Sequence, residues 1–234
     1  MSKGSLLMNK IKVMFLVSSY NIGGFEKKLS NLAENMNRKI FELTVLLVYP
    51  FYKARDNFIM IREKHRKFFL WNGVETIELE MKNRYQISVI GKVVNIMREN
   101  RPDVLCFIAL GSGTFLGPIA GKIAKVPFIV RLNDTILKGL YPNILKPLDK
   151  MLLSVTDQVI VPSVFLKNLL VQELRINPEK INVIPNGIDI SHFSSSGQKE
   201  SVKLELGLPE MSHVVGIIAN FSPVKAHKVL LHAV

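Results

Sequence analysis

Residues 11–36, IKVMFLVSSYNIGGFEKKLSNLAENM, contain the pattern that decides the fold. The run Ile11–Val17 is apolar and rich in β-branched and aromatic residues, which predicts a strand. Apolar residues then recur at positions 25, 29, 32, 33 and 36, the spacing of one face of a helix. Two glycines, Gly23 and Gly24, lie between these segments. The stretch is therefore predicted to be a strand, a glycine-containing loop and a helix, the first half of a βαβ unit.

The same alternation continues along the chain. Further strands are expected at 41–48, 74–79, 104–109, 128–132, 158–161 and 181–184, and helices near 87–98, 115–124 and 144–153. Ser163 follows a proline and is a suitable N-cap for a helix over 164–174. Strands that alternate with helices predict an α/β fold with a doubly wound, Rossmann-like parallel sheet.

The composition changes after Pro185, where residues 191–197 are rich in serine and have no apolar period. We expect a first domain over 1–186, a linker over 187–198 and the start of a second Rossmann-like domain over 199–234. The second segment is predicted to contain a helix at 199–206, a turn at 207–209, a buried strand at 213–219 and a helix from 225 onward. This second α/β unit is expected to be incomplete, as in a truncated chain.

Composition restricts the class of protein. The 234 residues are 48% hydrophobic, with a mean hydropathy of +0.22, so the chain is expected to be globular rather than disordered. Its longest apolar runs fall far short of the roughly 20 residues that a membrane span needs. The single cysteine, Cys106, lies in an apolar run and is predicted to be buried and unreactive. These features favour a cytoplasmic protein.

The formal net charge of +12 predicts attraction to an anionic partner, either nucleic acid, a phosphate-bearing substrate or acidic lipid. Basic and aromatic residues are densest over 53–71, which suits a peripheral contact with a membrane surface. A solvated helix face with aromatic core anchors explains the same pattern. The residues concerned are Lys53, Arg55, Arg62, Lys64, Arg66, Lys67, Phe58, Phe68, Phe69 and Trp71, with Phe51 and Tyr52 directly before them. No nucleic-acid-binding motif accompanies the charge, so nucleic acid is not the expected partner.

Gly23 and Gly24 lie where a ligand could approach the backbone and where a helix N-terminus favours phosphate. They do not form a G-x-G-x-x-G motif, and the second expected strand ends at Tyr49 and Pro50 without the acidic residue that binds a ribose. A nicotinamide-dependent enzyme is therefore disfavoured. A tight turn without a ligand remains an alternative for the two glycines.

Four segments, taken in order, resemble family 4 glycosyltransferases. They are G-G-F-E at 23–26, R-L-N-D at 131–134, V-I-P-N-G-I-D at 183–189 and A-N-F-S-P-V-K-A at 219–226. The resemblance extends over nearly the whole chain, and the third segment followed by the lysine-bearing loop is its most specific part.

The resemblance implies a GT-B fold and transfer of a sugar from a nucleotide-sugar donor to a glycan or lipid-linked acceptor, with retention at the anomeric carbon. Such enzymes act in glycan and cell-envelope polysaccharide biosynthesis. No Asp-x-Asp motif occurs, which agrees with a metal-independent site without a cofactor. Two alternatives stay open: an inactive truncated fragment, and an unrelated anion- or nucleic-acid-binding Rossmann domain.

On the donor side, the resemblance assigns Lys225 to the diphosphate, together with Gly23, Gly24 and Asn220. Asn220 stands where family members commonly have arginine, and Ala226 stands where they have glycine. The paired glutamates of the family, Glu-x7-Glu, would lie beyond residue 234, so low activity is expected of this chain alone.

On the acceptor side, Asn133 falls where many members have histidine, and Asp134 beside it could orient the acceptor or accept a proton. A simple Asn-Asp turn is the alternative. The loop of Gly111, Ser112 and Gly113 could line the cleft. Asn186 and Gly187 form a turn suited to a fixed connection between the domains. The donor nucleotide, the sugar, the acceptor and the linkage cannot be predicted from these residues.

Overall fold

The computed structural model describes residues 9–18, 24–50, 56–81, 88–108, 113–134, 146–193, 199–209, 211, 213–219, 221 and 225–233. The chain divides into two compact units, Met1–Ile188 and Asp189–Val234. The division therefore falls inside the V-I-P-N-G-I-D segment.

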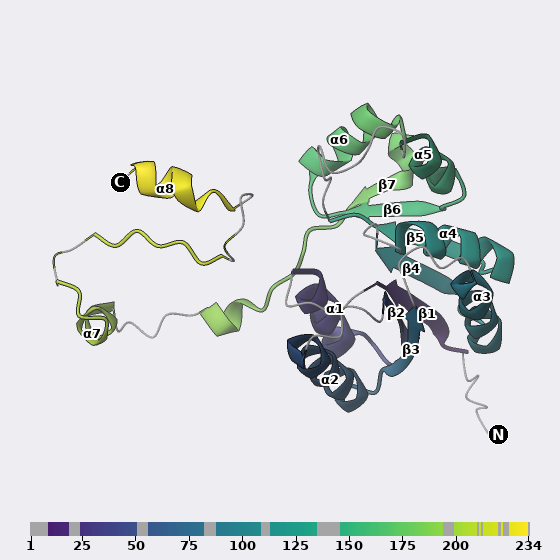
Figure 1. Cartoon of the computed structure of the whole chain (residues 1–234), viewed down its shortest axis with the longest axis horizontal. Helices are drawn as coiled ribbons and strands as arrows, with labels where there is room; N and C mark the ends of the chain where they lie inside the picture. Colours follow the sequence, from purple (N-terminus) through teal and green to yellow (C-terminus); the bar gives the residue numbers. More distant parts are fainter. Residues whose placement is uncertain are drawn as a thin grey trace, which may run out of the picture. The chain divides into compact units, whose positions relative to one another are not determined.

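The first unit contains a seven-stranded parallel sheet in the order β3-β2-β1-β4-β5-β6-β7 (Figure 1). The strands are β1 (Ile11–Val17), β2 (Phe41–Pro50), β3 (Glu75–Met81), β4 (Val104–Ile108), β5 (Phe128–Leu132), β6 (Gln158–Val161) and β7 (Ile181–Val183). The sheet extends from β1 in both directions, because β1 pairs with β2 on one side and with β4 on the other. The predicted doubly wound parallel sheet is confirmed.

Helices connect successive strands. They are α1 (Gly24–Asn35), α2 (Asp56–Trp71), α3 (Val89–Asn100), α4 (Gly113–Ala124), α5 (Lys146–Ser154) and α6 (Val164–Leu174), and the 3-10 turn η3 (Pro178–Lys180) precedes β7. The sequence specifies α6 locally, since the Ser163 hydroxyl accepts a hydrogen bond from the Leu166 N–H at 3.2 Å. At the other end of α6, Arg175 adopts a left-handed conformation and its N–H bonds to the Val171 carbonyl. The predicted N-cap is thus confirmed.

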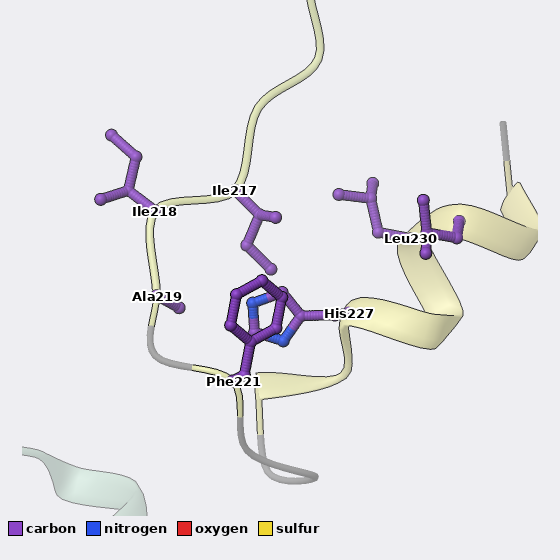
Figure 2. A pocket seen from close by; sticks show the side chains of 7 residues that line it. Ile217, Ile218, Ala219, Phe221, His227 and Leu230 are labelled. Carbon is purple, nitrogen blue, oxygen red and sulfur yellow. The ribbon is translucent and has the colours of Figure 1, made fainter.

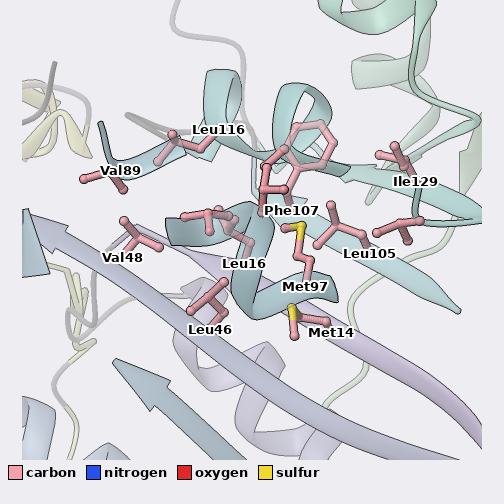
Figure 3. Close-up of a cluster of buried hydrophobic side chains, with 14 of the residues drawn as sticks. Met14, Leu16, Leu46, Val48, Val89, Met97, Leu105, Phe107, Leu116 and Ile129 are labelled. Atoms are coloured by element: carbon pink, nitrogen blue, oxygen red, sulfur yellow. The ribbon is translucent and has the colours of Figure 1, made fainter. Parts of the chain in front are cut away.

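The central strands are buried on both faces, as expected for a parallel sheet covered by helices. On one face, Val13, Phe15 and Val17 of β1 pack in a cluster with Leu29 of α1 and Phe69 of α2. On the other face, a second cluster joins the strands to α3 and α4, and Figure 3 shows its side chains converging. The labelled members are Met14, Leu16, Leu46, Val48, Val89, Met97, Leu105, Phe107, Leu116 and Ile129. A third cluster joins α5 and α6 to β6 and β7.

Helix α4 approaches the sheet closely because two residues on its inner face are glycines. A Cβ atom placed on Gly117 would lie 2.4 Å from Cγ of Phe107, and one on Gly121 would lie 2.8 Å from Cδ2 of Leu105. Real Cβ atoms are essentially never found at such separations. The two glycines therefore set the distance between α4 and β4.

Cys106 lies on β4 and is 8% exposed. Desolvation by burial raises the pKa of its thiol to about 12. The thiol therefore stays protonated at physiological pH. The prediction of a buried, unreactive cysteine is confirmed.

The described part of the second unit contains the 3-10 turn η4 (Ile190–Phe193) and two short helices, α7 (Lys199–Glu205) and α8 (His227–Ala233). The prediction of a buried strand at 213–219 was wrong, because these residues form no strand and most are exposed. A strand requires backbone hydrogen bonds to a neighbour, and the described part of the second unit supplies no such ladder. An apolar sequence alone does not make a strand.

In the described ranges, the structure has no helix that combines the length and the apolar character needed to span a bilayer.

Candidate functional site

The carboxyl ends of β1, β4 and β5 meet at one edge of the sheet, where the direction of strand succession reverses between β1 and β4. Open α/β sheets bind ligands at this position. Gly24 and Gly113 are the first residues of α1 and α4, so both helices begin at this edge. Gly23, Gly111 and Ser112, also predicted to line it, lie outside the described residues.

At the end of β5, Asn133 is fixed by both its main chain and its side chain. Its N–H donates to the Ile160 carbonyl at 2.9 Å. Its carboxamide oxygen accepts a hydrogen bond from Nε of Arg131 at 3.0 Å. Asn133 is only 2% exposed and is therefore buried in this structure. Its contact with an acceptor stays a prediction.

Arg131 also binds Asp149 of α5. Its Nη1 and Nη2 atoms donate to the two carboxylate oxygens at 2.5 and 3.2 Å, a bidentate pair. Both residues are buried, at 4% and 3% exposure. One guanidinium thus joins the end of β5 to α5.

Asp134 lies on the opposite side of the strand end, toward α1. Its Oδ1 atom is 3.0 Å from Nζ of Lys28, and each side chain is about one quarter exposed, at 26% and 24%. Asp134 is therefore the polar group of R-L-N-D that is both accessible and held in place. Its carboxylate can accept a hydrogen bond from a hydroxyl group, and the neighbouring ammonium can contact an anionic group.

Four ionised groups therefore form two pairs at the end of β5, Lys28 with Asp134 and Arg131 with Asp149. The charges of these four described groups sum to zero. Sequence reasoning missed the roles of Lys28, Arg131 and Asp149. A charged residue inside the apolar run of β5 was the available signal for Arg131, because buried arginines need a partner. Nothing local identified Lys28, which is 106 residues away from Asp134.

The turn of Asn186 and Gly187 lies against α1 at the end of the first unit. Nδ2 of Asn31 is 3.5 Å from the Gly187 carbonyl oxygen, and the turn residues are themselves exposed. Farther upstream, Ile184 donates its N–H to the Val161 carbonyl at 2.8 Å and so extends the pairing of β7. These contacts agree with an architectural role for the turn.

In the second unit, Lys225 is exposed and lies two residues before α8. Ala226 has φ of 53°, the left-handed region that favours glycine, and its carbonyl accepts hydrogen bonds from Val229 and Leu230 at 2.9 and 3.3 Å. The glycine that the family has at this place thus corresponds to a real backbone requirement. Asn220 lies outside the described residues.

The rings of Phe221 and His227, which precede and follow Lys225 in the sequence, are in contact, with centroids 4.9 Å apart. They also line a hollow of about 480 Å³, together with apolar side chains. Figure 2 shows the side chain of Ile217 pointing toward the two rings, with Leu230 on the neighbouring helix α8. The hollow is apolar, so it is not itself a site for a phosphate.

None of the described histidines, cysteines, aspartates and glutamates come together in threes as a metal ligand set would require.

A family model described as Glycosyltransferase Family 4 matches residues 22–192. The chain is 31% identical over 167 residues to UDP-Gal:alpha-D-GlcNAc-diphosphoundecaprenol alpha-1,3-galactosyltransferase of Escherichia coli, which is 68% of this chain and 42% of that relative. It is 30% identical over 103 residues to D-inositol 3-phosphate glycosyltransferase of Segniliparus rotundus, which is 43% of this chain and 23% of that relative. The chain thus spans less than half the length of these curated relatives.

Solved structures show the same fold. The match to Anabaena HepE in complex with UDP and glucose covers 95% of this chain and 57% of the HepE chain, with a TM-score of 0.72 and 22% identity. The match to a glycosyltransferase from Rickettsia africae covers 88% of this chain and 52% of the Rickettsia chain, with a TM-score of 0.62 and 17% identity.

Proposed function

The chain belongs to glycosyltransferase family 4, and from this we propose that it forms the acceptor-side part of a GT-B glycosyltransferase that takes its sugar from a nucleotide-sugar donor. The observation that carries the proposal is the family match over 22–192, which includes β5 and its polar end. The relative from E. coli is named for UDP-Gal and a diphosphoundecaprenol-linked acceptor. A lipid-linked or other glycan acceptor is therefore the substrate class that we propose here.

The donor and the acceptor of the reaction need different protein groups. As the donor breaks, the leaving nucleoside diphosphate gains negative charge, which cations and backbone N–H groups stabilise. We propose Lys225 for this role, with retention at the anomeric carbon and without a metal ion. On the acceptor side, Asp134 would accept a hydrogen bond from the attacking hydroxyl, supported by Lys28 at 3.0 Å.

Nucleotide binding tests this proposal. Titration of the full chain with UDP, GDP and single-stranded RNA is expected to give saturable binding of one nucleoside diphosphate. Lys225→Ala is expected to weaken that binding by roughly ten- to a hundredfold, because a hydrogen bond to a charged group contributes roughly 1.5–3 kcal/mol. Lys228→Ala removes another exposed lysine from α8 and serves as the matched control. Binding of RNA far tighter than that of either nucleotide would contradict the proposal.

We also propose a peripheral contact with an anionic membrane through the outer face of α2. Met60, Lys64, Lys67 and Trp71 follow one another at helical spacing. Met60 is 70% and Trp71 is 90% exposed, and both lysines are exposed. Exposed aromatic and basic groups on one helix face suit the interface of a bilayer. Helix α2 and its buried Phe69 agree equally with a solvated face, and a binding experiment distinguishes the two.

Co-sedimentation with phosphatidylglycerol vesicles measures this contact. Lys64→Gln combined with Lys67→Gln is expected to weaken partitioning about thirtyfold, because each basic residue near an anionic surface contributes about 1 kcal/mol. Trp71→Ala is expected to weaken it as well. Phe165→Ala is the control, since Phe165 is 75% exposed but lies on α6. Equal binding to phosphatidylcholine vesicles, or no effect of the α2 changes, would show that α2 does not contact membranes.

A further inference from the structure

Arg131 is a buried cation on the strand that ends at the candidate site. Val130 and Leu132 face the cluster beneath α1 and α2, so Arg131, between them, points to the opposite face of the sheet. It is met there by Asp149 of α5. A buried ion pair is expensive to desolvate and is weak evidence for stability, because apolar residues often replace such pairs at no cost. The geometry indicates a second role.

The guanidinium of Arg131 donates hydrogen bonds to two residues, Asp149 and Asn133. Nη1 and Nη2 bind Asp149, while Nε binds the carboxamide of Asn133 at 3.0 Å. Because Nε can only donate, the oxygen of the carboxamide must face it, which fixes the orientation of the amide. The Asn133 N–H is fixed separately by the Ile160 carbonyl. The residue before Asp134 therefore has neither main-chain nor side-chain freedom.

We propose that Arg131 is a positioning residue of the acceptor site, which acts through Asn133 to hold the Asp134 carboxylate against Lys28. Its buried place excludes direct contact with a substrate, so it is not a catalytic residue. Asp149 has a part in this role, because its two hydrogen bonds to Arg131 fix the plane of the guanidinium and hence the direction of Nε. The expected effect on acceptor binding rests on the proposed function. The contacts of Arg131 with Asn133 and Asp149 lie entirely within the first unit.

Two variants test the proposal. Arg131→Lys retains a positive charge beside Asp149 but lacks the planar fork that reaches both partners. The double variant Arg131→Met, Asp149→Leu removes both charges and is expected to keep its Tm within a few degrees of the parent. In both variants the side-chain amide of Asn133, followed by nitrogen-15 relaxation, is expected to change from rigid to mobile. Their affinity for a short-chain polyprenyl-diphosphate-linked N-acetylglucosamine is expected to fall about tenfold, with UDP affinity unchanged.

Arg38→Met is the matched control. Arg38 also joins two segments, through Nη2 and the carbonyls of Ala33 and Asn72, but it lies just before β2, at the opposite edge of the sheet. The change is expected to lower Tm without altering the Asn133 amide or the affinity for the acceptor analogue.

The outcomes separate the two proposals. A rigid Asn133 amide with unchanged acceptor affinity in the double variant would overturn the positioning role, as would an equal loss of affinity in Arg38→Met. If the double variant does not fold, the relaxation of Asn133 in Arg131→Lys decides alone. If the parent chain binds no acceptor analogue, the proposed function fails, and the relaxation measurement still shows whether Arg131 fixes Asn133.

Discussion

Gly117→Val is expected to destabilise the first unit by about 3 kcal/mol or more. A Cβ at this position would lie 2.4, 2.7 and 2.8 Å from three atoms of the Phe107 side chain. Phe107 is 1% exposed and belongs to β4, near the centre of the sheet, so its ring has nowhere to move. Overpacking a tight core costs about 1–3 kcal/mol, and displacement of α4 from the sheet adds the loss of its own contacts.

Urea denaturation followed by circular dichroism measures this effect. The matched control is Gly91→Ala in α3, where nothing lies within 4 Å of the added Cβ. Because alanine favours a helix over glycine, the control is expected to gain roughly 0.5–1 kcal/mol. A Gly117→Val variant with an unchanged midpoint would mean that α4 does not pack on β4 as described.

Asp149→Ala is expected to lower the free energy of unfolding by about 3–5 kcal/mol. The change leaves the buried guanidinium of Arg131 without its counter-ion, and an uncompensated buried charge is far more costly than a missing pair. The surface provides a comparison, because Lys12 and Glu42 are 3.9 Å apart with side chains 46% and 51% exposed. Glu42→Ala is expected to change stability by no more than about 0.5 kcal/mol, since an exposed pair is screened by solvent.

A double-mutant cycle completes the experiment. If Arg131→Met, added to Asp149→Ala, recovers a large part of the lost stability, the cost came from the isolated charge. If the two changes instead add independently, the bidentate pair does not exist in solution.

Local patterns predicted much of the fold. Residues 128–132, 158–161 and 164–174 have the bounds expected from sequence, because short apolar runs buried on both faces and a serine N-cap are strong local signals. These signals arise within a few residues, so one sequence is enough to detect them.

The errors and omissions concern features that need a distant partner. Residues 213–219 have an apolar, strand-like sequence, yet a strand exists only where another segment pairs with it. Lys28 reaches Asp134 across 106 positions, and Arg131 reaches Asp149 across 18. The motif that contains Asn133 and Asp134 was visible in the sequence, but its division into a buried residue and an accessible one depends on α1 and α5. Tertiary structure alone determines that division.

The strand order also affects how the chain is made. β1 is synthesised before both of its neighbours in the sheet, and these two strands are far apart in the sequence: Val13 lies opposite Leu43 in β2 and opposite Val104 in β4. At about 5–20 residues per second, the ribosome needs several seconds to proceed from β2 to β4. During that time one edge of an apolar strand has no partner, which makes the nascent chain a substrate for chaperones and liable to aggregate before β4 emerges.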